Sequence, residues 1–166
     1  MGKLTSFYEA VMDEPYDADD FSNRIAMQQI VLLAESMGLN LGGYMFVSKD
    51  RGPYSLVLRL DVLDEGAAIS TNSSRQIRFS KHTEAVIARL KDMVDFINPK
   101  EDFSKHEKYE LVAAMLYLAK NECRYKGKEA VFDKLISWKG EQLPFANLST
   151  SLNFETAWEK AESAIY

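Results

Sequence analysis

The stretch "KDRGPYSLVLRLDVL", residues 49–63, joins a tight turn directly to an apolar segment, and the expected fold depends on it. Pro53 suits the first turn of a helix, where a missing N–H group costs nothing. The sequence therefore predicts a helix over residues 53–65. Arg59 and Ser55 are expected on its outer side. The inward face is expected to consist of the apolar residues that recur at helical spacing, namely Leu56, Val57, Leu60 and Leu63.

The segments before this helix predict two more helices and an extended piece. A short helix over residues 4–12 ends before an acidic stretch. A longer helix begins at Ser22 or Asn23, either of which can cap the free N–H groups, and it ends at Gly38. Its apolar face is so wide that we expect this helix to be largely buried. Residues 44–47 then form a short extended segment.

The segment after the helix, "GAAISTNSSRQIRFS", predicts a two-stranded hairpin. Residues 68–71 and 76–79 have the composition of strands, and the polar residues between them supply a turn. A helix over residues 83–97 follows the hairpin. This order places the hairpin directly after the helix that opens at Pro53.

The last third of the chain is predicted to be helical. Ser104 and Glu107 have the spacing of a capping box at the start of a helix, and two further helices follow. These helices are too few to fold alone, so we expect them to pack on the preceding unit. The result is one compact structure in two parts, a winged-helix-like unit over residues 1–98 and a helical extension over residues 99–166.

This order of elements is typical of a winged helix-turn-helix. The expected fold class is therefore mainly α with a small β-hairpin, a winged helix-turn-helix-like unit with a packed C-terminal helical extension. Residues 53–65 would be the recognition helix and residues 67–80 the wing. Arg59 has an alternative role as a solvated side chain paired with Glu65 or Asp50. The candidate nucleic-acid contacts are Lys49, Arg51, Ser55, Arg59, Arg75, Arg78 and Lys81.

Two longer stretches carry a family resemblance. "RIAMQQIVLLAESMG" (24–38) and "GGYMFVSKDRGPYSLVLRLDVL" (42–63) resemble the YwgA-like family of bacterial proteins, and more distantly the SocA-like antitoxin domains, also called Panacea. The shared pattern is a helix with a glutamine-containing core, a glycine, a short aromatic strand and a Gly-Pro turn. Gln29 stands where the family usually has a lysine. The resemblance implies a winged-helix-like fold without catalytic residues, and the antitoxin-like relatives hold a partner protein.

The composition limits the classes of function. A net charge of −5 and a pI near 5.1 weigh against a protein that coats nucleic acid, because such binding depends on neutralising phosphates. No apolar run is long enough to span a bilayer and no export signal precedes the first helix, so we expect a cytoplasmic protein without a membrane partner. The single Cys123 cannot form an internal disulfide. The chain has only two histidines, His82 and His106, in addition to this cysteine, so we expect neither a metal site nor a cofactor.

Two functional hypotheses follow. The first is a non-enzymatic DNA-binding regulatory protein, in which helix 53–65 and the wing contact DNA and the C-terminal helices support a homodimer. The second is a protein-binding module of antitoxin-like or defence-associated type, which the acidic total charge favours. An enzyme would require a cleft that gathers His106, Cys123 and distant carboxylates, and we expect no catalytic residues.

Overall fold

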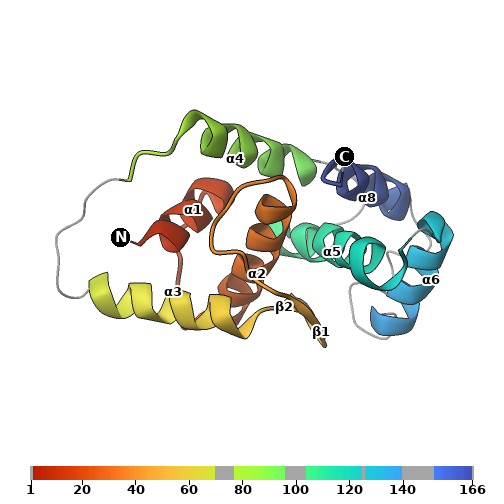
Figure 1. Ribbon diagram of the computed structural model, residues 1–166, viewed down its shortest axis with the longest axis horizontal. Coiled ribbons are helices and arrows are strands. Elements are labelled where there is room, and N and C mark those ends of the chain that lie inside the picture. Colours follow the sequence, from red (N-terminus) through yellow and green to blue (C-terminus); the bar gives the residue numbers. More distant parts are fainter. Residues whose placement is uncertain (1, 70–76, 96–103, 125, 140–151, 166) are drawn as a thin grey trace.

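The computed structural model describes residues 2–69, 77–95, 104–124, 126–139 and 152–165. In these residues the chain is mainly helical with one two-stranded antiparallel hairpin (Figure 1), which agrees with the predicted fold class. The helices are α1 (Lys3–Met12), α2 (Phe21–Ser36), α3 (Leu56–Ile69), α4 (Lys81–Met93), α5 (Lys105–Tyr117), the π-helix η1 (Leu118–Glu122), α6 (Gly127–Lys139) and α8 (Leu152–Ser163). The hairpin strands are β1 (Val47–Lys49) and β2 (Gly52–Tyr54), with Val47 opposite Tyr54.

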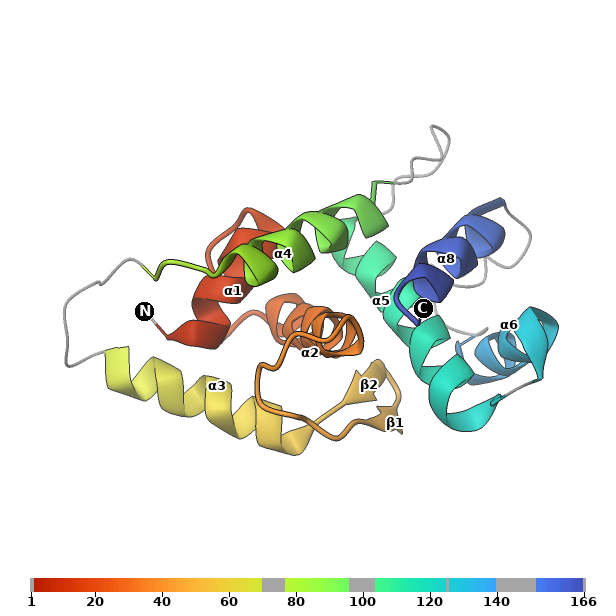
Figure 2. The same ribbon diagram turned by 45° about the horizontal axis from the view of Figure 1, so that its top comes forward.

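The core is built around α2 and α5, which pack against each other at the centre of the molecule (Figure 2). Their buried residues include Ile30 and Leu33 from α2 and Leu111 and Met115 from α5. On one side of this pair, α1 lies between α3 and α4; on the other, α8 and α6 pack on α5 and its η1 extension. The C-terminal helices thus cover the same core as the N-terminal ones.

The helix ends show which capping predictions are correct. Ser104 and Glu107 form the predicted capping box at the start of α5. At the start of α2, however, the cap is Asp20, whose carboxylate accepts hydrogen bonds from the N–H groups of Ser22 and Asn23. A carboxylate at this position also interacts favourably with the helix dipole. The cap therefore lies two or three residues earlier than the sequence predicted.

The prediction that Pro53 opens a helix is wrong. Pro53 lies in β2, opposite Ser48, and α3 begins only at Leu56. A fixed φ near −65° suits an extended strand at a sheet edge as well as a first helical turn, so proline alone did not distinguish the two. The predicted extended segment is likewise shifted, from residues 44–47 to β1. Gly52 has φ +112°, which allows the turn between the two strands.

The wing predicted over residues 67–80 is also wrong in the residues that can be compared. Residues 67–69 continue α3, and residues 77–80 form no strand. Residues 70–76, which hold the predicted turn and Arg75, lie outside the described part of the chain. Alanine is the strongest helix former, so Ala67 and Ala68 favour an extension of α3 over a strand. The hairpin of this protein therefore precedes α3 rather than following it.

The face of α3 that points inward differs from the prediction. Leu58 and Val62 are buried. The carboxylate of Glu65 lies on the same side and accepts hydrogen bonds from the N–H groups of Leu4 and Thr5 at the start of α1, at 3.0–3.2 Å. Spacing alone could not decide the face, because this helix has apolar residues on both sides. The residues predicted to face the core are instead exposed by 46–60%, namely Leu56, Val57, Leu60 and Leu63.

Candidate functional site: an arginine groove between α2 and α3

A concave apolar surface lies between the first half of α2 and the first turns of α3. Its main pocket has a volume of about 410 Å³, and a neighbouring pocket of about 280 Å³ lies over the hairpin. The two pockets share Ile25 and Tyr54, so they form one continuous surface, here called the arginine groove. Its apolar walls come from Tyr16, Phe21, Ile25, Met27, Pro53, Tyr54, Val62 and Leu63, and its cations are Arg24, Lys49, Arg51 and Arg59.

The ring of Phe21 lies close to two of the arginines. The guanidinium carbons of Arg24 and Arg51 are each 5.5 Å from the centre of its ring, within the range of a cation–π interaction. Arg24 is held in place because it donates hydrogen bonds to the carbonyls of Ala18 and Asp19, at 2.8 and 2.9 Å. Phe21 itself is 49% exposed. The groove thus presents an accessible aromatic ring flanked by two positive charges.

The start of α3 is fixed by a buried side chain of α2. The amide of Gln28 exchanges two hydrogen bonds with the backbone of Ser55: the Ser55 N–H donates to Oε1 at 2.7 Å, and Nε2 donates to the Ser55 carbonyl at 3.1 Å. Both groups are buried, where an unpaired polar group would be costly. This pair holds α2 and α3 at the separation that leaves the groove between them.

The hairpin turn is fixed from two sides. Nε2 of Gln29 donates to the carbonyl of Arg51 at 3.4 Å, and Nζ of Lys139 in α6 donates to the carbonyl of Asp50 at 3.3 Å. Lys139 also forms a buried ion pair with Glu110 of α5, at 2.6 Å. Burial lowers the pKa of Lys139, and the neighbouring Glu110 carboxylate opposes this shift. The turn that carries Arg51 is therefore rigidly connected to the core.

The predicted nucleic-acid contacts do not form one surface. Lys49, Arg51 and Arg59 are exposed and line the groove. Arg78 and Lys81 are exposed at the start of α4, on the far side of α1 from α3 (Figure 1). The structure thus brings together three of the predicted basic residues and separates two others from them.

Ser55 and Arg59 have surroundings that differ from the prediction. Ser55 is 2% exposed, and its hydroxyl oxygen lies 3.4 Å from the N–H group of Leu58 that it caps, so it is not on an accessible face. Arg59 makes no ion pair within the described ranges. Its expected partner Glu65 instead caps α1. Arg59 is therefore an accessible cation at the edge of the groove.

Sequence reasoning missed Phe21 and Arg24 as site residues. Both lie in the first turn of α2, and with Gln28 they recur at positions i, i+3 and i+7 of one helix face. Such spacing places the three residues on one face. The predicted helix, however, began after Phe21 and was expected to be largely buried. A carboxylate cap at Asp20 was the signal that would have placed Phe21 inside the helix, on the same face as Arg24.

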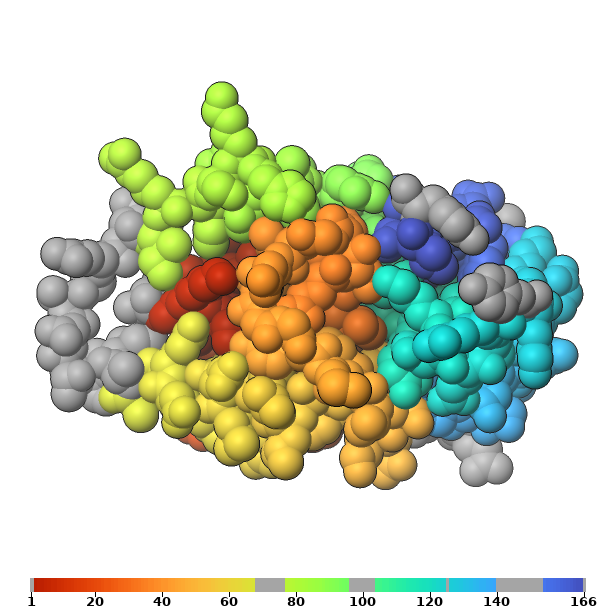
Figure 3. Space-filling view, viewed as in Figure 1, coloured from red at the N-terminus to blue at the C-terminus, as the bar shows by residue number. Residues whose placement is uncertain are grey.

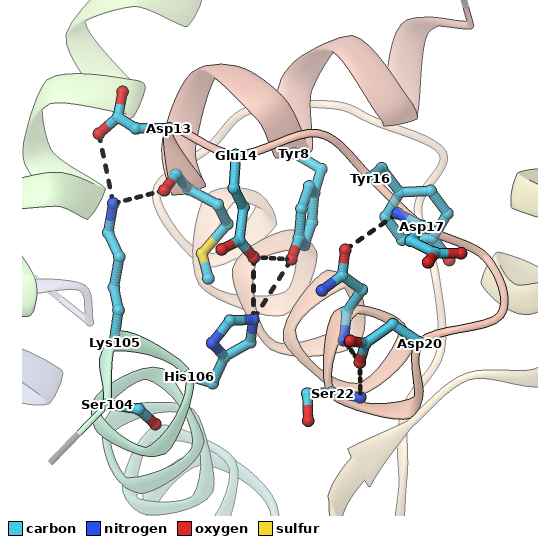
Figure 4. Close-up of polar contacts among 12 residues, drawn as sticks. Tyr8, Asp13, Glu14, Tyr16, Asp17, Asp20, Ser22, Ser104, Lys105 and His106 are labelled. Carbon is cyan, nitrogen blue, oxygen red and sulfur yellow. Dashed lines mark hydrogen bonds and ion pairs between the residues drawn. The ribbon is translucent and has the colours of Figure 1, made fainter.

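A second polar cluster joins α1 to α5 (Figure 4). The hydroxyl of the fully buried Tyr8 donates to Oε1 of Glu14 at 2.6 Å, and Nε2 of His106 lies 3.0 Å from the same oxygen. Burial and the hydrogen bond to Glu14 raise the pKa of Tyr8. Lys105 completes the connection by donating to the carbonyls of Val11 and Met12 at the end of α1, where a cation is favourable.

This cluster does not include Cys123. At the helical rise per residue, His106 and Cys123 are roughly 25 Å apart along α5 and η1. The Cys123 thiol is buried and lies 3.5 Å from the Ala130 carbonyl, while Glu122 lies 3.4 Å from Lys134. His106 and Cys123, which the enzyme hypothesis requires in one cleft, are therefore far apart.

Comparisons with family models, with curated proteins and with solved structures found no match to this chain. Among the residues that the structure describes, no group of three or more histidine, cysteine, aspartate or glutamate residues could hold a metal ion. In the same residues, no helix has the length and apolar character needed to cross a membrane.

Proposed function

We propose that this protein is a non-enzymatic binding module that holds an acidic segment of a partner protein in the arginine groove. One observation carries the proposal: an apolar concave surface is bordered by Arg24, Arg51 and Arg59 on a chain whose net charge is −5. Aromatic residues and arginines surrounding an apolar pocket are the groups that dominate protein–protein binding energy. A protein-holding role also agrees with the resemblance to antitoxin-like domains.

The partner segment that fits the groove has two chemical features. A bulky apolar side chain fills the pocket between Phe21 and Val62, and carboxylates next to it pair with the arginines. Arg24 is already oriented by two backbone carbonyls, so it loses little side-chain entropy on binding. The oriented arginines therefore favour a carboxylate over a neutral group.

A peptide-display selection against the 166-residue chain tests this function. We expect enriched peptides to combine a bulky apolar residue with neighbouring Asp or Glu, and R51E to weaken the selected peptides at least about tenfold, as loss of a charged interface pair does. K126E is the matched control, because Lys126 is exposed outside the groove. Peptides without carboxylates, or binding that R51E leaves unchanged, would contradict the proposal.

DNA is the second candidate partner, because Lys49, Arg51 and Arg59 are exposed beside one another and could contact phosphates. Carboxylates at Asp61 and Asp64 on the same helix weigh against it. A mobility-shift series with a mixed-sequence duplex separates the two partners. Affinity that falls steeply with salt, together with no selected peptide, would favour DNA over a protein partner.

A further inference from the structure

The outward face of α3 carries a regular apolar stripe. Leu56, Leu60, Leu63 and Ala67 are separated by four, three and four residues, and all four are exposed. This is the spacing of the a and d positions of a coiled coil, with Leu56 and Leu63 at d and Leu60 and Ala67 at a. We call these four residues the α3 seam.

The α3 seam is displayed on a preformed helix. Leu58, Val62 and Glu65 hold the opposite side of α3 against the molecule, so the seam points away from the core. In the space-filling view α3 forms the lower edge of the molecule (Figure 3). Three leucines that are each 46–58% exposed form a contiguous apolar patch, and such patches mark interaction sites. A partner that covers the seam need not supply energy to fold the helix.

The charges beside the seam favour a second copy of the chain as the partner. Arg59 occupies the g position and Asp64 the e position, five residues later. When two such helices pair in parallel, the g residue of one lies next to the e residue of the following heptad of the other. Neither side chain makes an ion pair within its own chain among the described residues. Both are therefore available for pairing between copies.

Orientation follows from the same charges. A two-fold axis parallel to α3 generates the Arg59–Asp64 contact twice, once on each side of the seam. In an antiparallel pair, g positions face g positions, so Arg59 would face Gly66 and no opposite charge would meet it. We propose that the protein forms a parallel two-fold dimer through the α3 seam, with Arg59 of each copy paired with Asp64 of the other.

Sedimentation velocity of the 166-residue chain over a range of concentrations tests the dimer. We expect the mass to rise from 18.9 kDa toward twice that value as concentration increases. L60E should remove the dimer without unfolding the monomer, because Leu60 is already 51% exposed there; circular dichroism checks the fold. A protein that stays monomeric, or a dimer that tolerates L60E, would overturn the proposal.

Charge reversal tests the orientation. R59D and D64R should each weaken self-association about tenfold, since each replaces two attractive contacts by two repulsive ones. An equimolar mixture of R59D and D64R should form a heterodimer, because both cross-chain contacts are then attractive. A mixture that associates no better than either variant alone would reject the parallel arrangement.

Arg59 and Leu63 line the groove and also belong to the proposed dimer contact, so variants at other residues are needed to test the two proposals separately. R51E alters the groove but not the α3 seam, so it should leave the sedimentation profile unchanged. L60E and D64R lie outside the groove lining, so they should leave peptide binding intact. R51E, L60E and D64R therefore distinguish a failure of partner binding from a failure of the dimer.

Discussion

At the scale of single residues, Glu65 decides which side of α3 faces the core. Its carboxylate accepts the free N–H groups of Leu4 and Thr5, which no backbone carbonyl of α1 can reach. Leu58 and Val62 lie on the same side of the helix, so the cap and the buried side chains act together. Because Glu65 holds this side of α3 against α1, the apolar stripe on the other side of the helix is exposed.

We therefore predict that E65A lowers the free energy of unfolding by about 1–2 kcal/mol, the usual cost of losing a helix cap. E65Q should cost less, because the amide oxygen can still accept a hydrogen bond. Urea unfolding followed by circular dichroism measures both changes. E159A, at an exposed position of α8, is the control and should stay within about 0.5 kcal/mol; an equal loss in E159A and E65A would contradict the capping role.

At the scale of elements, the residues around Gly52 and Pro53 are compatible with either the hairpin or the start of α3. The positive φ of Gly52 and the pairing of Pro53 with Ser48 assign these residues to β2. The hydrogen bonds between Gln28 and the Ser55 backbone then fix where α3 begins. The register of the hairpin thus positions both Arg51 and the first turn of α3 at the groove.

Replacing one glycine in the hairpin and one in α3 by alanine is expected to change stability in opposite directions. G52A should destabilise the protein by about 1–3 kcal/mol, because its φ is unfavourable for a side chain. G66A should stabilise it by about 0.5–1 kcal/mol, because Gly66 is helical and a Cβ there meets no atom within 4 Å. Thermal unfolding measures both. Stabilisation by G52A would contradict the positive φ at Gly52, because alanine is unfavourable in that conformation.

At the scale of the whole molecule, Lys139 connects parts that are distant in the sequence. Its Nζ reaches Glu110 in α5 and the carbonyl of Asp50 in the hairpin turn, so the end of α6 is tied to the groove. The lysine side chain is 0% exposed and that of Glu110 is 11% exposed. An intact buried ion pair of this kind adds little net stability, but removing one partner is costly because the other charge is left buried.

K139M should therefore lower the free energy of unfolding by about 3–5 kcal/mol, because it leaves the Glu110 carboxylate buried without its cation. The double variant K139M/E110L should lose less than K139M alone, since no unpaired charge remains. Guanidinium unfolding of the single and double variants completes a double-mutant cycle. Strictly additive losses would show that the two charges do not interact in solution.

Much of the fold was predictable from local patterns. The capping box at Ser104, the stop at Gly38 and the helical spacing in α2, α4 and α5 each act over a few residues, so the sequence by itself determined that the described part of the chain is mainly helical. It also predicted a small hairpin, but placed it after α3 instead of before it. Of the site, it identified Lys49, Arg51 and Arg59 as exposed basic residues. These are properties of composition and short-range periodicity.

The tertiary structure alone decided which face of α3 is buried and where the hairpin lies. Apolar residues occur on both sides of α3, so the apolar spacing is compatible with burial of either face. Contacts with α1 and α2, which are dozens of residues away in the sequence, bury the face that carries Leu58 and Val62. The groove has the same origin, because Phe21 and Arg59 come together only when α2 and α3 pack. A short segment of this sequence is compatible with more than one local structure. The contacts between segments that are distant in the sequence determine which of these structures forms.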